Sequence, residues 1–318
     1  MADSQEKLLA ELPPDTLPLW KQMTRLNPPL PAPTCVPHIW HMRKLLPLLQ
    51  RAGHLVSEAE AERRVLMLIN PGRNDAPYTT DTLYAGLQLV MPHETAPAHR
   101  HVAFAMRFVI SGTGGFTAVD GQRVRMARGD VILTPQWAWH DHGNEGPDPV
   151  IWLDALNLPL FQALPVHFVE HYKEPRYPAK DVDKGESPIV FPWAEVQAVL
   201  DAKAQAGDTK AEHRYRLADG AELSTTIGAG AVRVAPGQWI QGSGSTASGV
   251  YHVVSGSGRL ELRERVKLEF AEGDTFCVPA WQDFILGAGE EPVYLYYFDD
   301  IPLLRVLGFY RERTDEDG

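Results

Sequence analysis

The second half of the chain repeats the first at a fixed offset of 144 residues. The segment RFVISGTG at 107–114 matches YHVVSGSG at 251–258. Without a gap, the same offset aligns further turn and strand positions: Pro92/Pro236, Gly129/Gly273, Asp130/Asp274, Pro135/Pro279, Trp137/Trp281 and Gly143/Gly287. Self-similarity of this kind indicates duplicated domains, so we expect two copies of one strand-rich unit.

Two pairs of histidines lie in the first copy. His99 and His101 are one residue apart, and His140 and His142 repeat that spacing about forty residues later. Side chains alternate between the faces of a strand, so each pair would project from one face. Hairpin-linked strands of a small barrel can bring both pairs to one point, where imidazole nitrogens suit Zn, Cu, Fe or Ni. Four unrelated histidines are the alternative, and two same-face pairs favour the metal site.

The second copy serves as an internal control for these histidines. The offset places Ser243, Ser245, Phe284 and Leu286 where the first copy has its four histidines. A scaffold that needed the histidines would keep them in both copies. We therefore expect one metal site, in the first copy, and a structural, metal-free second copy.

The stretch GDVILTPQWAWHDHGN, residues 129–144, is similar to the second cupin motif. It has Gly, five residues and Pro, then a His and an Asn four residues later, although Trp137 stands where a Gly is usual. The first cupin motif is matched by His99, His101 and Gly112. Together with APAHRH and the RFV segment, WHDHGN resembles the gentisate/salicylate 1,2-dioxygenase group of cupins.

This resemblance implies an all-β fold of two tandem cupin (double-stranded β-helix, or jelly-roll) barrels with an N-terminal helical arm. We place the arm and short helices at residues 1–65 and the metal-binding barrel at 66–160. A connector with a helix follows at 161–220, and the second, metal-free barrel with the C-terminal tail covers 221–318.

The resemblance also implies the metal ligands, which are His99, His101 and His140. Many cupins have a glutamate ligand after the second histidine, and Ala105 occupies that position. Three neutral imidazoles leave a divalent iron its full charge and about three open positions, as in facial-triad sites. The expected cofactor is Fe(II), which would bind a 2-hydroxybenzoate through its carboxylate and ortho oxygen together with dioxygen.

Three further residues are candidates for catalysis. Arg107 has the strand parity of His99 and His101, and its planar guanidinium can hold a substrate carboxylate; an arginine paired on the barrel rim is the alternative. His142 would then lie near the substrate as a hydrogen-bond donor or acid/base. Asp154, between apolar residues, needs a partner, and we expect it to pair with His142 and fix its tautomer.

Three residues are candidates for the ring pocket. Tyr84 and Gln88 share parity on the strand before the ligands, and ordinary barrel packing is their alternative role. Phe104 lies between His101 and Arg107, where the family leads us to expect a small residue. We therefore expect a phenyl group near the mouth that favours a 5-substituted or bicyclic hydroxy acid over gentisate.

The predicted function is ring cleavage by insertion of both oxygen atoms between the carboxyl-bearing and hydroxyl-bearing carbons of gentisate, salicylate or a 5-substituted salicylate such as 5-nitrosalicylate. A metal-dependent cupin isomerase or lyase is a rival, although Ala105 removes the glutamate that such enzymes more often keep. A non-catalytic bicupin binding protein is another, and it predicts no tight metal.

The composition of the chain limits the binding partners and the cellular location that we expect. The chain of 318 residues has 30 Lys and Arg against 41 Asp and Glu, and the net charge of −11 argues against a nucleic-acid backbone. No apolar run approaches the roughly 20 residues that span a membrane. Two cysteines and no apolar leader favour the cytoplasm. The family resemblance implies a homotetramer.

Overall fold

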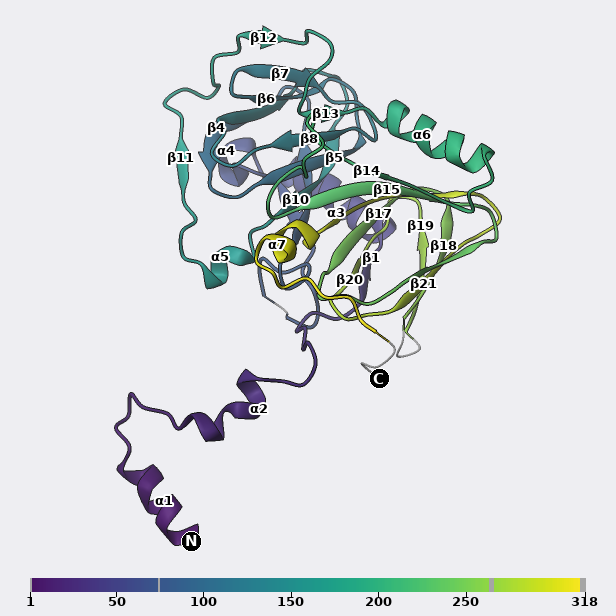
Figure 1. The fold of residues 1–318 in the computed structure, drawn as a ribbon. Helices are drawn as coiled ribbons and strands as arrows, with labels where there is room; N and C mark the ends of the chain where they lie inside the picture. Colours follow the sequence, from purple (N-terminus) through teal and green to yellow (C-terminus); the bar gives the residue numbers. More distant parts are fainter. Residues whose placement is uncertain (1, 74, 263–265, 315–318) are drawn as a thin grey trace. The chain divides into compact units, whose positions relative to one another are not determined.

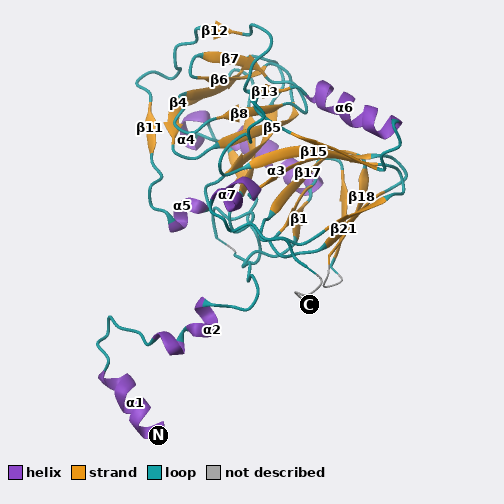
Figure 2. Ribbon diagram, viewed as in Figure 1, coloured by secondary structure: helices purple, strands orange, loops and turns teal. Residues whose placement is uncertain are grey.

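The computed structural model describes residues 2–73, 75–262 and 266–314 (Figure 1). The chain divides into two units. The smaller unit comprises residues 1–32 and 314–318, and its described helices are α1 (Ala2–Glu11), η1 (Leu19–Lys21) and α2 (Met23–Leu26). The larger unit, Pro33–Arg313, contains the described strands, which dominate it in Figure 2.

The described strands form four sheets, two for each barrel, and the all-β prediction of two tandem barrels is confirmed. The first barrel has the strand orders β13-β8-β5-β10-β3-β2 and β11-β4-β9-β6-β7-β12. Its strands are β2 (Val65–Met67), β3 (Tyr84–Val90), β4 (Thr95–His101), β5 (Ala105–Ser111), β6 (Gly115–Val119), β7 (Gln122–Arg125), β8 (Val131–Thr134), β9 (His140–Asn144), β10 (Val150–Leu156), β11 (Val169–His171), β12 (Asp181–Val182) and β13 (Val190–Phe191).

The second barrel has the orders β1-β20-β17-β22-β15-β14 and β16-β21-β18-β19. Its strands are β1 (His38–Trp40), β14 (Lys210–Arg214), β15 (Gly228–Val234), β16 (Trp239–Gly242), β17 (Gly249–Ser255), β18 (Ser257–Leu262), β19 (Lys267–Ala271), β20 (Thr275–Val278), β21 (Phe284–Ala288) and β22 (Val293–Asp299). The helices of the larger unit are α3 (Met42–Leu55), α4 (Glu58–Ala61), α5 (Leu160–Ala163), α6 (Trp193–Gln205) and α7 (Ile301–Val306).

The structure reproduces the 144-residue offset strand by strand. Shifting β3, β5, β8 and β9 by that number gives the bounds of β15, β17, β20 and β21. Trp137 and Trp281 both have a left-handed backbone, with φ of 63° and 65°. Glycine is usual at this motif position because a side chain in that conformation costs roughly 1–2 kcal/mol. Both copies therefore keep this turn despite the energetic cost of its left-handed conformation.

Each barrel is completed by a strand that precedes the other barrel in sequence. β1 pairs with β20, and the Asp274 carboxylate accepts a hydrogen bond from the amide of Met42, the first residue of α3, at 2.9 Å. In the same way β13 pairs with β8, and Asp130 accepts from the amide of Trp193, which begins α6, at 3.0 Å. α3 and α6 themselves pack on the barrel that follows each of them in sequence, against β3 and against β14–β15. Residues of the predicted arm and connector thus belong to barrel sheets, and the domain boundaries stay a prediction.

We expect Asp130→Ala and Asp274→Ala each to lower the free energy of unfolding by about 1–2 kcal/mol, because a helix-capping carboxylate is lost. Since the β1–β20 and β13–β8 pairings and the core shared by the two barrels remain, denaturant unfolding should stay a single transition in both variants. A second transition in either variant would contradict the reciprocal docking.

The side chains of β5 alternate between two cores. Its even residues, Met106 and Phe108, enter a core formed by both barrels, where Phe108 stacks on Tyr296 with ring centroids 4.7 Å apart. Its odd residues face the interior of the first barrel, where Val109 packs with Trp152. Arg107 shares that inward parity, so the barrel interior receives its guanidinium.

Candidate metal centre

Neighbouring strands bring three imidazoles together in the first barrel. His99 and His101 lie on β4, and His140 on β9 is the direct cross-strand partner of His99. One ring nitrogen from each of the three lies within 4.8 Å of the others. The arrangement matches the expected ligand set and needs no carboxylate.

A backbone carbonyl lies within hydrogen-bond distance of Nδ1 in each of the three rings. The Nδ1 atoms of His101 and His140 lie 2.8 and 2.9 Å from the carbonyl oxygens of Ala103 and Ala138. Nδ1 of His99 lies 3.2 Å from the Pro97 carbonyl. An Nδ1–H that donates to a carbonyl leaves the Nε2 lone pair free, which is the usual support for a metal-bound histidine. The residues present therefore fit a divalent metal at the three Nε2 atoms.

Burial keeps these rings neutral. It lowers the pKa of His101 to about 4 and that of His99 to about 2, where the nearby Arg63 guanidinium adds to the effect. Burial also holds the pKa of His140 well below the ordinary value of 6.5. Because only the neutral ring can bind a metal, the site is ready for metal at neutral pH.

We expect metal affinity to change little between pH 7.5 and pH 6.0. Three ordinary imidazoles would lose about fifty-fold over that interval, because each becomes mostly protonated. Here the folded pKa values lie below the interval, so the loss should stay within about twofold. Anaerobic equilibrium dialysis against Fe(II) at both pH values measures this, and a fifty-fold loss would show that the rings titrate normally.

His142 differs from the other three histidines in the hydrogen-bond partner of its Nδ1. It is fully buried on β9, and its Nδ1 lies 2.6 Å from the Thr117 hydroxyl of the paired strand β6. Its Nε2 has no hydrogen-bond partner in the described part of the chain. Burial holds its pKa well below the ordinary value, with Arg107 as the next cause. The ring therefore offers a neutral nitrogen to whatever binds beside the metal.

The expected pairing of Asp154 with His142 is wrong. Asp154 lies opposite Arg107 on the adjacent strand, with 3.4 Å between its Oδ1 and the arginine Nε, and accepts a hydrogen bond from Trp152 Nε1 at 2.9 Å. His142 lies in the other sheet, where Thr117 is its neighbour. Burial raises the pKa of Asp154 to about 6, and Arg107 opposes that rise.

A cavity of about 750 Å³ opens beside two of these imidazoles. His99, His101 and Leu156 line it, and so does Arg63, which precedes β2. Arg63 Nη2 donates to the Pro97 carbonyl at 2.8 Å and lies 2.5 Å from His99 Nδ1. The Pro97 carbonyl can accept hydrogen bonds from both Arg63 and the Nδ1–H of His99. If Arg63 donated to Nδ1 instead, the ring proton of His99 would lie on Nε2 and exclude a metal. The first arrangement is the one that leaves Nε2 of His99 free for a metal.

Tyr84 and Gln88 face the interior of the first barrel, as their parity predicted. Both are buried, and they share their face of β3 with Val90, which packs in the barrel interior. Burial raises the pKa of Tyr84, and the Asp154 carboxylate adds to that rise, so the phenol stays protonated.

The expected position of Phe104 at the pocket mouth is wrong. Its side chain is 1% exposed and packs in the core shared by the two barrels. Phe104 lies three residues from both His101 and Arg107, so it has the opposite parity and points out of the barrel.

The sequence analysis missed several residues at this site. Arg63 ends a charged stretch that gives no periodic signal, and Thr117 is one of many strand residues. His171 pairs with His99 across β11 and β4, with ring centroids 6.4 Å apart, and His167 lies 6.0 Å from His101. The spacing of four between these two histidines was the available signal, in a segment predicted to be only a connector.

Known proteins that are similar to this chain include cupin proteins and dioxygenases. The Cupin domain family matches residues 86–156. Gentisate 1,2 dioxygenase 1 of Aquipseudomonas alcaligenes is 35% identical, over 94% of this chain and 92% of its own. The 5-aminosalicylate 1,2-dioxygenase of Comamonas sp is 33% identical over 93% of this chain and 86% of its own.

A solved structure is similar over nearly the whole chain. The salicylate 1,2-dioxygenase of Pseudaminobacter salicylatoxidans superposes with a TM-score of 0.89 at 30% identity, covering 99% of this chain and 98% of its own. That enzyme has also been solved as adducts with gentisate. Among the described residues, no helix has the length and apolar character needed to span a membrane.

Proposed function

The chain belongs to the gentisate/salicylate 1,2-dioxygenase family and is a dioxygenase, and we propose that it uses Fe(II) to cleave the ring of a 2-hydroxybenzoate. Cleavage would insert both atoms of dioxygen between the carboxyl-bearing and hydroxyl-bearing carbons. The observation that carries the proposal is the cluster of three imidazoles, two of which, His99 and His101, line the cavity. Relatives that act on gentisate and 5-aminosalicylate support the substrate class.

His99, His101 and His140 would hold the iron. Neutral imidazoles are suitable iron ligands, and they leave the ion its full charge. Bound iron supplies a Lewis acid and open positions for a chelating anion and dioxygen. The other groups of the chain bind and orient the substrate.

Arg63 is the cation best placed to attract the substrate carboxylate. Its hydrogen bonds go to the backbone carbonyls of Glu62 and Pro97, and within the described ranges no carboxylate forms an ion pair with it. Burial lowers its pKa to about 10, so it stays charged at neutral pH. The positive charge of Arg107 is balanced by Asp154, and its Nη1 donates to Thr134. We propose that Arg63 attracts the carboxylate and that Arg107 orients it deeper in the barrel.

His142 is proposed to hold the proton of the substrate hydroxyl. Its neutral Nε2 accepts that proton, while Thr117 Oγ1 can accept a hydrogen bond from Nδ1–H, because the hydroxyl itself donates to the Asp141 carbonyl. A positioned imidazole of this kind contributes about 10²–10⁴-fold to a rate. Tyr84 and Gln88, both on β3, are proposed to contact the aromatic ring of the substrate. Asp154 would act through Arg107 as a positioning residue.

Oxygen uptake tests the proposal. The protein is loaded anaerobically with Fe(II) and mixed with gentisate, salicylate, 5-aminosalicylate and 5-nitrosalicylate in separate oxygen-electrode runs. We expect one dioxygen consumed per ring opened with at least one of them, and zinc-loaded protein as the inactive control. No uptake with any of the four would reject the proposed reaction.

We also propose a cytoplasmic homotetramer. The two cysteines, Cys35 and Cys277, are free and buried, as is common in a reducing compartment. Light scattering of the purified protein would give four times the chain mass of 35.4 kDa, and a monomer mass would reject the tetramer.

A further inference from the structure

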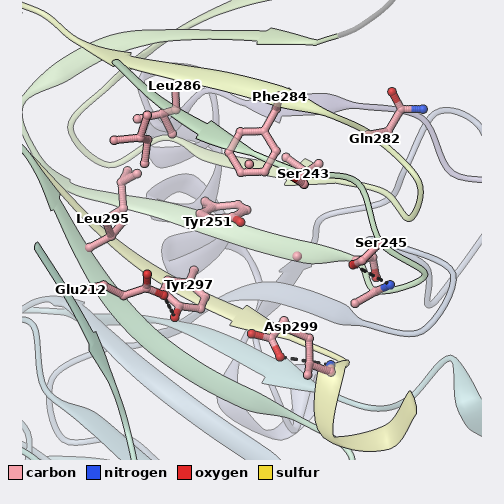
Figure 3. A pocket seen from close by; sticks show the side chains of 18 of the residues that line it. Glu212, Ser243, Ser245, Tyr251, Gln282, Phe284, Leu286, Leu295, Tyr297 and Asp299 are labelled. Carbon is pink, nitrogen blue, oxygen red and sulfur yellow. Dashed lines mark hydrogen bonds between the residues drawn. The ribbon is translucent and has the colours of Figure 1, made fainter. Parts of the chain in front are cut away.

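The second barrel contains its own cavity, of about 410 Å³ (Figure 3). The five positions that the 144-residue offset derives from the four histidines and Arg107 all line it. They are Ser243, Ser245, Phe284, Leu286 and Tyr251. The duplicated barrel has therefore kept a pocket at the place of the metal site, with its chemistry replaced. Its volume lies within the usual range for small-molecule sites.

The interior of this cavity is apolar and aromatic. Leu286 and Leu295 are buried in the core of the second barrel and line the cavity beside Phe284. The Tyr251 ring lies 6.1 Å from Phe284 and 5.7 Å from Tyr297, measured between centroids. Three rings around one space suit a flat aromatic ligand.

Hydrogen-bond donors face the same space. Figure 3 shows the Tyr251 hydroxyl directed toward the side of the cavity on which Ser243 and Ser245 lie. Burial raises the pKa of Tyr251, so its hydroxyl remains a donor. In the part of the chain that the structure describes, the side chains of Tyr251, Ser243 and Gln282 have no hydrogen-bond partner. A ligand with acceptor oxygens would satisfy them.

The charges of the lining favour an anion. Lys210 pairs with Glu212 at 2.9 Å, and Arg216 with Glu222 at 2.9 Å. Asp299 is the third carboxylate of the lining, and it forms an ion pair with Arg214. Arg305 also lines the cavity, and among the described residues it forms no ion pair; its guanidinium lies 5.1 Å from the Tyr310 ring. One positive charge thus remains, and no carboxylate is left for a metal.

From these contacts we propose that the second barrel is a metal-independent binding site for a small aromatic carboxylate. The ring packs among Tyr251, Phe284 and Tyr297, and the carboxylate accepts hydrogen bonds from Tyr251 and Ser243, with Arg305 supplying the uncompensated charge. This site goes beyond the proposed function, because it needs neither iron nor dioxygen.

The first test locates the ligand. Crystals of the metal-free full-length protein are soaked with 4-bromobenzoate, and data are collected at the bromine absorption edge. We expect an anomalous peak inside the second barrel, beside Tyr251. A peak in the first barrel alone, or no peak, would overturn the proposal. Neither result depends on oxygenase activity, so the proposed function is tested separately.

The second test measures affinity in solution. Calorimetric titration of the metal-free protein with benzoate is repeated with three variants. Ser243→Trp should fill the cavity and weaken binding at least about tenfold, and Tyr251→Phe should weaken it about tenfold by removing one donor to a charged group. Gln238→Trp, on an exposed turn of the same barrel outside the cavity, is the matched control and should bind as the unaltered chain does. Equal affinities in all four proteins would overturn the assignment.

Discussion

We expect His140→Ala to abolish metal binding and His142→Ala, two residues away on the same strand, to retain it. Both rings are almost fully buried, and both have an Nε2 without a hydrogen-bond partner among the described residues. They differ in their support. A backbone carbonyl fixes Nδ1–H of His140, and His140 lies across from His99 in the three-imidazole group.

The expected loss for His140→Ala exceeds the 10–100-fold that removal of a supporting group typically costs in metal affinity. His142→Ala should keep one metal per chain and lower kcat by about 10²–10⁴-fold, as expected for a lost acid/base group. Metal analysis after anaerobic loading and desalting, with single-turnover kinetics, separates the two effects. Metal loss in His142→Ala with retention in His140→Ala would reverse the assignment.

Asp154→Ala should lower the free energy of unfolding by about 3–5 kcal/mol. The substitution leaves the Arg107 guanidinium buried, with both partners of the pair under 10% exposed, and an unpaired buried charge costs this much. A pKa of about 6 for Asp154, even beside an arginine, reflects how dry this part of the barrel is. Urea denaturation of the metal-free protein measures the change without interference from bound metal.

A double variant, Arg107→Met with Asp154→Leu, is the control for that prediction. Replacing a buried ion pair with apolar side chains of similar volume is often neutral in stability. The second barrel supports this expectation, because Tyr251 lies opposite Tyr297 across β17 and β22, as Arg107 lies opposite Asp154 across β5 and β10, and the strands still pair. The double variant should therefore be nearly as stable as the unaltered chain and have little activity. Equal destabilisation of the single and double variants would show that packing, and not charge, is responsible.

Patterns within single strands and between the two copies were readable from the sequence. Period-two alternation predicted that His99 and His101 share a face, and the structure places both on β4, with their ring centroids 5.3 Å apart. The repeat offset gave the bounds of four strands in the second barrel from those in the first. Both signals can be read from one sequence, because the first depends on residues near each other in the chain and the second on comparing the chain with itself.

Contacts between neighbouring strands of a sheet were not readable in the same way. Asp154 pairs with Arg107 because β10 lies next to β5, and Thr117 supports His142 because β6 lies next to β9. The order of strands in a barrel is set by long-range pairing that periodicity does not encode. Arg63 reaches the pocket from outside the repeat-defined strands, so no pattern identified it. The error on Phe104 was avoidable, since its parity already excluded the barrel interior.

The most direct test of the account is a crystal structure of protein loaded anaerobically with Fe(II), with data collected on both sides of the iron absorption edge. The account predicts one anomalous peak per chain, beside Nε2 of His99, His101 and His140, and none in the second barrel. A peak among Ser243, Ser245 and Phe284, or an empty first barrel at full iron loading, would contradict it.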